Sequence, residues 1–386
     1  MPDARKTHDL RSVAAVFAPL GWRAIGGPAV HVALMEREIV LKRHWVERSE
    51  FARLFAACKL VPGPSSTQLA LLLGLRRAGV AGMLLTALLF IGPAVLVMLG
   101  LAELYIHFGS SAQVQLVLLG IDAAVVGIVA RAAVDLSALG RRGIVELAIA
   151  AAALAAGLLG VNPLAVLAGG GVPAYCAWLL RNAKHGQHAG SGRVTSGMPW
   201  LAAIHGPTLA AGLLPLSLTF LKIGAVAFGS GYALLPFLHA DLVGGTFHLT
   251  ERQVADAFAL SQVTPGPVFA VAAFLGVQIA GIPGGVLAAV AIFAPSLVYA
   301  PMVSVVMRVT QTRPGLRAEL DGVVVAAVGL IASACVSLAA VAFVGPIEVV
   351  IAILVFALLL RWPRAQPWGV VIGVLGGLLL IMATMH

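Results

Sequence analysis

Charged residues are scarce in this chain. Only 11% of its 386 residues are Asp, Glu, Lys or Arg, whereas 60% are hydrophobic. Soluble domains carry about 25% charged residues, so this deficit excludes an ordinary soluble domain. Cysteine is also rare: Cys58, Cys176 and Cys335 are isolated, and none takes part in a CxxC or Cys/His spacing. The pattern indicates neither a disulfide framework nor a metal site, and we interpret the three as small core residues.

Catalytic signatures are missing as well. The sequence holds no HExxH pair, no P-loop glycine pattern, no Ser/His/Asp grouping and no metal-ligand cluster. We therefore predict no enzyme activity, no metal and no cofactor. Arg5, Lys6 and Arg11 precede the first apolar stretch, but no small-residue cleavage site follows it, so we expect no removed signal peptide.

Long apolar runs dominate what is present. The mean hydropathy is +1.00, and several runs approach or exceed the ~20 residues that span a bilayer. The predicted fold class is therefore an all-α polytopic membrane protein, whose surrounding partner is the lipid bilayer. We attribute the formal net charge of +9 at pH 7 to basic cytoplasmic loops and expect no nucleic-acid binding.

Motifs recur along the chain at a constant spacing. Pro62-Gly63-Pro64 returns as Pro265-Gly266-Pro267 (265 − 62 = 203), and the same offset carries residues 26–28 onto residues 229–231. At an offset of 202, residues 73–82 fall on residues 275–284. The pattern predicts a duplicated unit. Its parts are a first repeat at 1–181, a polar linker at 182–206 that holds His185 and His188 in a solvated loop, and a second repeat at 207–386.

Basic residues predict the orientation of the repeats. Lys and Arg flank the interrupted segment 51–75 on both sides, whereas its repeat, 253–276, has only Arg252 beside it. By the cytoplasmic bias of basic loops, each interrupted segment is re-entrant, and the two come from opposite faces. Each repeat then has about five spanning helices, among them 13–34 and 207–238, and the repeats have inverted topology. The side of the N-terminus stays open, because an extra crossing near Gly26 would reverse it.

The interruption at Pro62-Gly63-Pro64 favours an anion site. Proline removes a backbone donor, so the incoming helix should stop near residue 60, and Pro64 suits the first turn of the outgoing helix. The leading N–H groups at Ser65, Ser66 and Thr67 would then point into the break, beside their own hydroxyls. A helix N-terminus carries about +0.5 of an elementary charge, which attracts anions. The alternative is a packing kink or an ordinary loop between two short helices.

Several motifs closely resemble the chromate ion transporter family in its long, two-domain form. They are "HVALMERE" and "LVPGPSSTQLALLLGLRRAGVAG" in the first repeat, and "FLKIGAVAFGSGYALLP" and "LSQVTPGPVFAVAAFLG" in the second. The resemblance implies a bacterial inner-membrane protein that exports chromate from the cytoplasm and confers chromate resistance, with sulfate as the oxyanion that chromate mimics. The family places a basic residue in the first helix of each repeat. Lys222 fills that position in the second repeat, but Pro19 aligns with it in the first, where Arg23 follows one turn later.

Basic residues inside apolar segments are the candidates for charge compensation of an anion. These are Arg23, Lys59, Arg131 and Lys222. Lys59 could instead snorkel to the interface, and Arg131 is expected to pair with Asp135 four residues on. Lys222 lies two helical turns before the second glycine motif. The predicted substrate-binding residues are Lys59, Pro62, Gly63, Pro64, Ser65, Ser66, Thr67, Gln68, Lys222, Gly26, Gly27, Gly229, Ser230, Gly231, Pro265, Gly266 and Pro267.

Three questions stay open at this point. The substrate could be another oxyanion such as sulfate or molybdate, and the protein could be a channel. The oligomeric state is also open, and a homodimer is the assembly that we consider for the protein. Acidic or titratable residues that could carry a coupling proton are Glu36, Glu38, Asp122, His239, Asp241 and Asp321. A uniporter needs none of them, because an inside-negative potential already favours outward movement of an anion.

Overall fold

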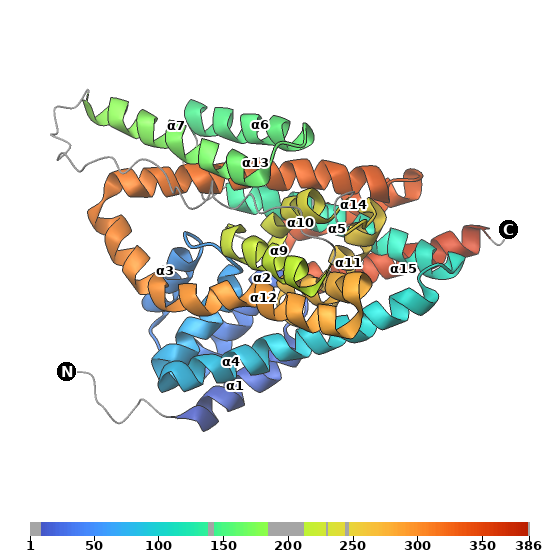
Figure 1. Ribbon diagram of the computed structural model, residues 1–386, viewed down its shortest axis with the longest axis horizontal. Helices are drawn as coiled ribbons and strands as arrows, with labels where there is room; N and C mark the ends of the chain where they lie inside the picture. Colours follow the sequence, from blue (N-terminus) through green and yellow to red (C-terminus); the bar gives the residue numbers. More distant parts are fainter. Residues whose placement is uncertain (1–8, 138–142, 184–211, 229–230, 244–246, 385–386) are drawn as a thin grey trace.

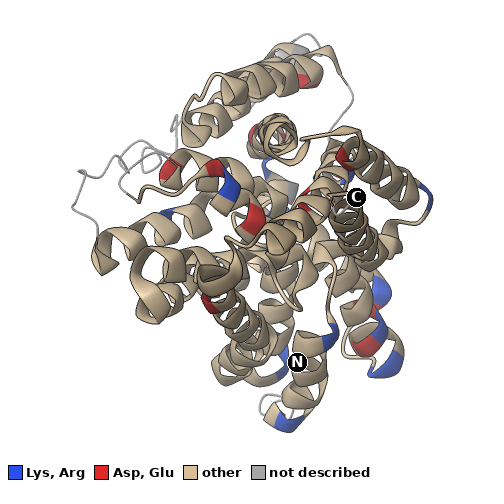
Figure 2. Ribbon diagram, turned by 90° about the vertical axis from the view of Figure 1, so that its right-hand side faces the viewer, with Lys and Arg blue, Asp and Glu red and all other residues tan. Residues whose placement is uncertain are grey.

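The computed structural model describes residues 9–137, 143–183, 212–228, 231–243 and 247–384, and that part of the chain is helical. Five helical segments are long and apolar enough to cross a membrane: Ser65–Phe108, Ala112–Ser137, Pro163–Leu180, Val268–Thr310 and Pro314–Ala342. Charged positions are few along the ribbon in Figure 2. The prediction of an all-α polytopic membrane protein is confirmed. His185, His188 and the predicted site residues Gly229 and Ser230 lie outside the described residues.

Figure 1 shows the helices of the described residues in chain order. The first half contains α1 (Leu10–Arg23), α2 (Gly27–Met35), the π-helix η2 (Glu36–Lys42), α3 (Arg48–Cys58), α4 (Ser65–Phe108), α5 (Ala112–Ser137), α6 (Ile144–Leu158) and α7 (Pro163–Ala183). The second half contains α9 (Leu213–Val226), η3 (Gly231–Leu234), α10 (Leu235–Leu242), α11 (Glu251–Val263), η4 (Val268–Ala270), α12 (Val271–Thr312), α13 (Pro314–Ala342), α14 (Pro346–Arg361), η5 (Pro363–Ala365) and α15 (Gln366–Thr384).

The first apolar segment of each half is divided into two helices. The expected continuous span at 13–34 is wrong, because α1 ends at Arg23 and α2 starts at Gly27. Gly26 and Gly27 have φ of +110° and +75°, a left-handed backbone that glycine adopts without strain and that no α-helix contains. The expected span at 207–238 is divided likewise, since α9 ends at Val226. Each half therefore carries two interruptions.

The interruptions of the two halves pair with each other. Gly63 N–H donates to the Ala227 carbonyl at 2.6 Å, and Gly266 N–H donates to the Ala24 carbonyl at 2.9 Å. Antiparallel bridges join Ile25 to Pro265 and Pro62 to Phe228. Each Pro-Gly-Pro motif thus pairs with the glycine break of the other half, which satisfies backbone groups that helices cannot. We call these two backbone pairings the first crossing (Pro62-Gly63 with Ala227-Phe228) and the second crossing (Ala24-Ile25 with Pro265-Gly266).

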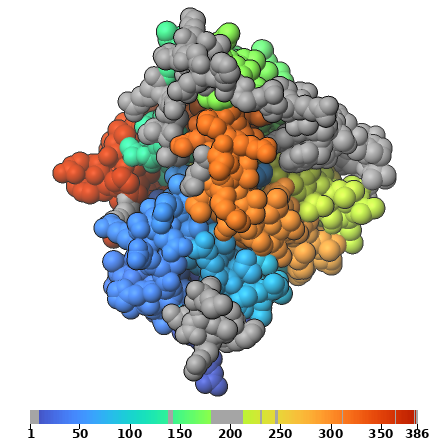
Figure 3. Space-filling model, turned by 90° about the vertical axis from the view of Figure 1, so that its left-hand side faces the viewer, coloured from blue at the N-terminus to red at the C-terminus, as the bar shows by residue number. Residues whose placement is uncertain are grey.

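Close packing recurs at corresponding positions of the two halves. A Cβ at Gly21 would overlap the Leu89 carbonyl oxygen, and a Cβ at Gly224 would overlap the Ile292 carbonyl oxygen. α1 packs against α4, and α9 packs against α12. α12 also packs against α3 and α4 of the first half. Figure 3 shows this mixing of the halves, with the orange surface of α12 beside the blue surface of the first half.

The long helices α4 and α12 are each bent sharply at one point. Ala78 and Gly79 in α4 and Ala280 and Gly281 in α12 leave helical geometry, and the two glycines have φ of +64° and +65°. A Cβ at Gly74 would reach the carbonyl of Gly82 at 2.8 Å, so the chain turns back on itself there. The short segments after each Pro-Gly-Pro are therefore separate from the long spans that follow them.

Polar contacts place the beginning of α1 next to the bend of α4. Asp9, which caps α1, lies 2.7 Å from Arg77, and Arg76 lies 2.5 Å from Glu50 in the first turn of α3. The Arg77 guanidinium also lies over the Trp45 ring. Its hydrogen bond, followed by that of Ser12 N–H, lowers the pKa of the Asp9 carboxyl. The starts of α1 and α3 thus share one face of the protein with the Arg76-Arg77 pair.

Two of the three cysteines differ from their expected core placement. Cys58 is fully buried at the end of α3, as expected, but Cys176 is exposed on α7 and Cys335 is half-buried. The Cys335 thiol contacts the Val126 carbonyl at 3.6 Å. In a membrane protein an exposed small apolar side chain faces lipid without penalty, which is why hydropathy alone did not separate core from surface.

Candidate functional site

The first crossing brings the predicted hydroxyl and amide residues into the interior. α3 ends at Cys58 and α4 begins at Ser65, with Pro64 as an N-cap that offers no capping side chain. The side chains of the first turn of α4 are buried, with exposures of 0–3%. They are Ser65, Ser66, Thr67 and Gln68. The first N–H groups of α4 are therefore surrounded by polar side chains and not by lipid.

Three of the buried polar atoms near this helix start have no hydrogen-bond partner among the described residues. They are Thr67 Oγ1, Gln68 Oε1 and Ser296 Oγ. Gly63 lies close to Gln68 and Ser296, because a Cβ built on it would lie 2.8 Å from Gln68 Nε2 and 3.3 Å from Ser296 Oγ. Gln68 also donates its amide to the Pro62 carbonyl. Buried polar groups without partners are costly, and their concentration at an uncapped helix start is typical of a ligand site.

His31, which the sequence reading did not select, places its ring between the two crossings. Its Nδ1 lies 3.3 Å from Ser66 Oγ and its Nε2 lies 3.1 Å from the Ala24 carbonyl. The Ala24 carbonyl accepts only, so Nε2 carries the proton and Nδ1 accepts from the Ser66 hydroxyl. The ring links the glycine break of the first half to the start of α4. Its sequence signals were its place one turn after Gly27 and its position at the start of the "HVALMERE" motif.

The second crossing is lined differently. Val268, Phe269 and Ala270 occupy the positions that hydroxyl residues hold in the first, and all three are buried. Polar groups reach this crossing from elsewhere. Gln366 donates to Tyr232 at 2.8 Å and approaches Gln262 at 3.4 Å, and a Cβ at Gly27 would lie 2.7 Å from the Gln366 amide.

The remaining predicted glycines and prolines also lie at the crossings. Gly26 packs against Pro367, and Gly231 starts η3 against Val268. Gly266 packs against Ala94 beside the second crossing. The structure thus brings together the described glycines and prolines of both motifs, in two pairings and not in one shared break.

The basic candidates take up separate positions. Lys222 in α9 forms an ion pair with Asp241 in α10 at 2.6 Å, and the two side chains are 18% and 19% exposed. The Lys59 ammonium lies over the Phe55 ring, 4.5 Å from its centroid. The expected pairing of Arg131 with Asp135 is confirmed at 2.5 Å. Arg23 is exposed at the end of α1. Only Lys222 therefore joins a mostly buried charge pair close to an interrupted helix.

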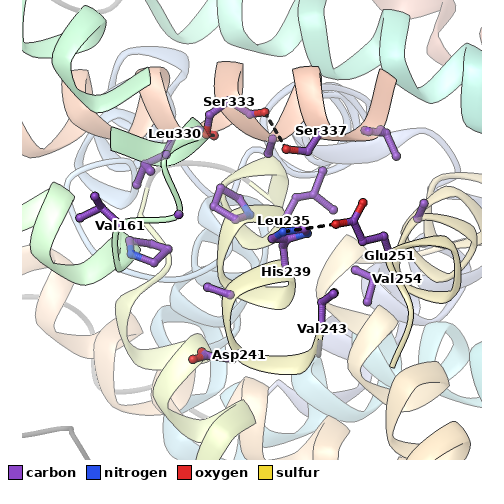
Figure 4. A pocket seen from close by; sticks show the side chains of 18 of the residues that line it. Val161, Leu235, His239, Asp241, Val243, Glu251, Val254, Leu330, Ser333 and Ser337 are labelled. Carbon is purple, nitrogen blue, oxygen red and sulfur yellow. Dashed lines mark hydrogen bonds and ion pairs between the residues drawn. The ribbon is translucent and has the colours of Figure 1, made fainter. Parts of the chain in front are cut away.

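A cavity of about 390 Å³ lies between the α6–α7 turn, α10, α11 and α13 (Figure 4). His239 and Glu251 approach each other across it at 3.9 Å, and Asp241 also lines it. Ser333 and Ser337 close the opposite wall on α13. The cavity therefore reaches Asp241, the acidic partner of Lys222.

Comparison with known proteins places this architecture in a family. The chromate transporter family model matches residues 11–175 and again residues 214–381. The chromate transport protein of Cupriavidus metallidurans is 31% identical over 374 residues, which cover 95% of this chain and 92% of that protein. The probable chromate transport protein of Synechococcus elongatus is 29% identical, with coverage of 86% and 85%. No solved structure matches the chain. The chain belongs to the chromate transporter family.

Proposed function

We propose that this protein exports chromate from the cytoplasm across a bacterial inner membrane and thereby confers chromate resistance. Two related proteins of comparable length carry the name chromate transport protein. The observation that supports an anion site in this chain is the set of partnerless buried groups on Thr67, Gln68 and Ser296 around the start of α4. Of these, the Thr67 and Ser296 hydroxyls can donate their missing hydrogen bonds to an oxyanion, whereas Gln68 Oε1 only accepts.

The chemistry of the first crossing suits a tetrahedral dianion. The N–H groups of Ser65, Ser66 and Thr67, the hydroxyls of Ser65 and Thr67, and the second amide N–H of Gln68 are neutral donors that can replace water around the anion without trapping it. Positive potential comes from Lys59 and Lys222. Because Asp241 holds Lys222, an anion that approaches Lys222 competes with that carboxylate. Outward movement is favoured by the membrane potential, at about 2.3 kcal/mol per charge for 100 mV.

The two repeats have inverted topology in this proposal. The face that carries Arg76 and Arg77, with the start of α1, is cytoplasmic by the bias of basic residues. The equivalent bend at Gly281 has no basic residue beside it and lies on the periplasmic face. The pairing of each break with the other half then sets both crossings inside the membrane, where the halves can move against each other.

Reporter fusions test this topology. A reporter fused after Arg77 should be active only as a cytoplasmic reporter, whereas fusions after Gly281 and at residue 386 should be active only as periplasmic reporters. Paired phosphatase and fluorescent-protein fusions at each site provide the control for expression. Activity of the Arg77 and Gly281 fusions on the same side would disprove the inverted arrangement.

The anion site is tested by removing its partnerless hydroxyls. Thr67→Val and Ser296→Ala should each weaken chromate affinity by about 0.5–1.5 kcal/mol, because each removes one neutral hydrogen bond to the anion. The measurement is chromate uptake into inverted vesicles at matched membrane abundance. Ser333→Ala is the matched control, since that buried hydroxyl on α13 bonds the Leu330 carbonyl away from both crossings.

The same vesicles separate the alternatives. Unlabelled chromate inside should accelerate entry of labelled chromate if the protein is a carrier, and should not do so if it is a channel. Uptake of sulfate or molybdate in preference to chromate would assign another oxyanion. Wild-type affinity in both hydroxyl variants would show that the anion site lies away from the first crossing.

A further inference from the structure

A buried pair of carboxyl groups joins the two halves away from the crossings. Asp122 in α5 is fully buried and faces Asp256 in α11, which is 2% exposed. α5 belongs to the first half, and α11 leads directly into the second Pro-Gly-Pro motif. The pair therefore lies where a long spanning helix meets an interrupted segment of the other half.

Two carboxyl groups share one cation there. Arg252 Nε lies 3.3 Å from Asp256 Oδ1, and Arg252 Nη2 lies 4.0 Å from Asp122 Oδ2. The Tyr105 hydroxyl donates to Asp256 Oδ2 at 2.6 Å. Asp256 thus accepts one hydrogen bond and forms an ion pair, whereas neither oxygen of Asp122 receives a hydrogen bond from the described residues. With both acids ionised, the cluster would carry one uncompensated negative charge in a buried site.

The other elements that pack on α5 do not supply the missing cation. α15 has no charged residue. On α14, Glu348 accepts the Gly345 N–H in the first turn, and Arg361, the last residue of the helix, lies over the Trp362 ring. On α13, Cys335 contacts the Val126 carbonyl, so Asp321 and the charged residues before it lie about 20 Å or more farther along the helix axis. On α5 itself, Arg131 is held by Asp135.

A single proton resolves this imbalance. If Asp122 is protonated, its O–H can donate to Asp256 Oδ1, the other carboxyl oxygen in the cluster without a hydrogen-bond partner. The cluster is then neutral, with one ionised carboxylate, one guanidinium and one carboxylic acid. Two nearby carboxyls that cannot both ionise share a proton in this way.

We propose that Asp122 and Asp256 form a proton-binding site whose loading is coupled to anion transport. Only the coupling part of this inference rests on the proposed transport function. The site spans two elements that belong to different halves. Movement of α11 against α5 would separate the carboxyls, free Asp122 from Asp256 and release the shared proton. Intramembrane carboxyls with this placement are typical of proton relays in transporters.

Proton binding is tested without any substrate. Infrared difference spectra of the reconstituted protein, recorded across a pH titration, should contain a carboxylic acid band that is absent from Asp122→Asn. Asp135→Asn, on the same helix, is the matched control and should keep the band. Tyr105→Phe removes a donor from Asp256 and should make the band persist to higher pH. A band that survives in Asp122→Asn, or that Tyr105→Phe leaves unmoved, overturns the site.

Coupling is tested in proteoliposomes. An imposed pH gradient should change the rate of chromate uptake severalfold in the wild type and in Asp135→Asn, and should have no effect in Asp122→Asn, which should retain chromate exchange. A pH-gradient response in Asp122→Asn overturns the coupling. Loss of the acid band on addition of sodium ions at fixed pH would make the pair a cation site and would overturn the proton assignment. Absence of chromate exchange in the wild type would count against the proposed function. The infrared test of proton binding would remain valid, because it uses no substrate.

Discussion

Replacing Lys222 by glutamine should lower the free energy of unfolding by about 3 kcal/mol. The substitution leaves Asp241 without its 2.6 Å partner in a site where both side chains are less than one-fifth exposed. Breaking a buried ion pair costs about 3–5 kcal/mol because an uncompensated charge remains, and the residual exposure of this pair favours the lower end. Chemical unfolding of the purified protein in detergent measures the loss.

A second substitution separates stability from transport. Lys222→Gln combined with Asp241→Asn removes both charges and should recover most of the lost stability. Chromate uptake should stay reduced in the double variant, since the positive charge that attracts the anion is gone. The matched control is Arg131→Gln, whose partner Asp135 is 55% exposed, so the loss there should be at most about 1 kcal/mol. Full recovery of uptake in the double variant would assign the pair a purely structural role.

Alanine at the crossing glycines should abolish most transport. Gly63 and Gly266 have φ of +105° and +87°, where a side chain costs about 1–3 kcal/mol. A Cβ at Gly266 would also lie 2.7 Å from the Ala94 Cβ, and each glycine N–H donates across its crossing. We expect Gly63→Ala and Gly266→Ala each to reduce the chromate uptake rate about tenfold or more, the equivalent of 1.4 kcal/mol or more in the transport barrier.

The control for backbone strain is Gly160→Ala. Gly160 also has a positive φ, +72°, but a Cβ there would meet nothing within 4 Å, and it lies in the α6–α7 turn. That variant should insert normally and keep most of its transport. Equal losses at Gly160 and at the two crossing glycines would mean that the backbone pairing between the halves has no specific role in transport.

The sequence-based predictions that the structure confirms rest on the chemistry of residues close together along the chain. Hydropathy predicted a polytopic membrane protein, because a bilayer selects apolar helices of a set length. Pro62 and Pro64 predicted the helix ends on either side of them, since proline lacks an N–H and clashes with the preceding turn. The i to i+4 spacing of Arg131 and Asp135 predicted their ion pair. Each of these inferences needs only neighbours along the chain.

The sequence-based expectation of a continuous first span failed, because hydropathy fits both an unbroken and a divided helix. The stretch around Gly26 is apolar enough to be a continuous span, and hydropathy does not register that two left-handed glycines divide it. The role of Lys222 in the anion site stays a prediction, but its ion pair with Asp241, 19 residues away, depends on helix packing that the sequence does not specify. Only the structure shows that this charge is already balanced.

The sequence by itself predicted membrane helices whose motifs recur at a constant spacing, with interruptions at Pro62-Gly63-Pro64 and Pro265-Gly266-Pro267. The tertiary structure decided which interruption pairs with which, and it added His31, Ser296 and Gln366 to the crossings. It also brought Asp256 to Asp122 and to Tyr105, which lies 151 residues from it along the chain. Helical periodicity predicts which residues of one helix lie on the same face and contact each other. Contacts between distant helices depend on the packing of the whole bundle, which no local pattern encodes.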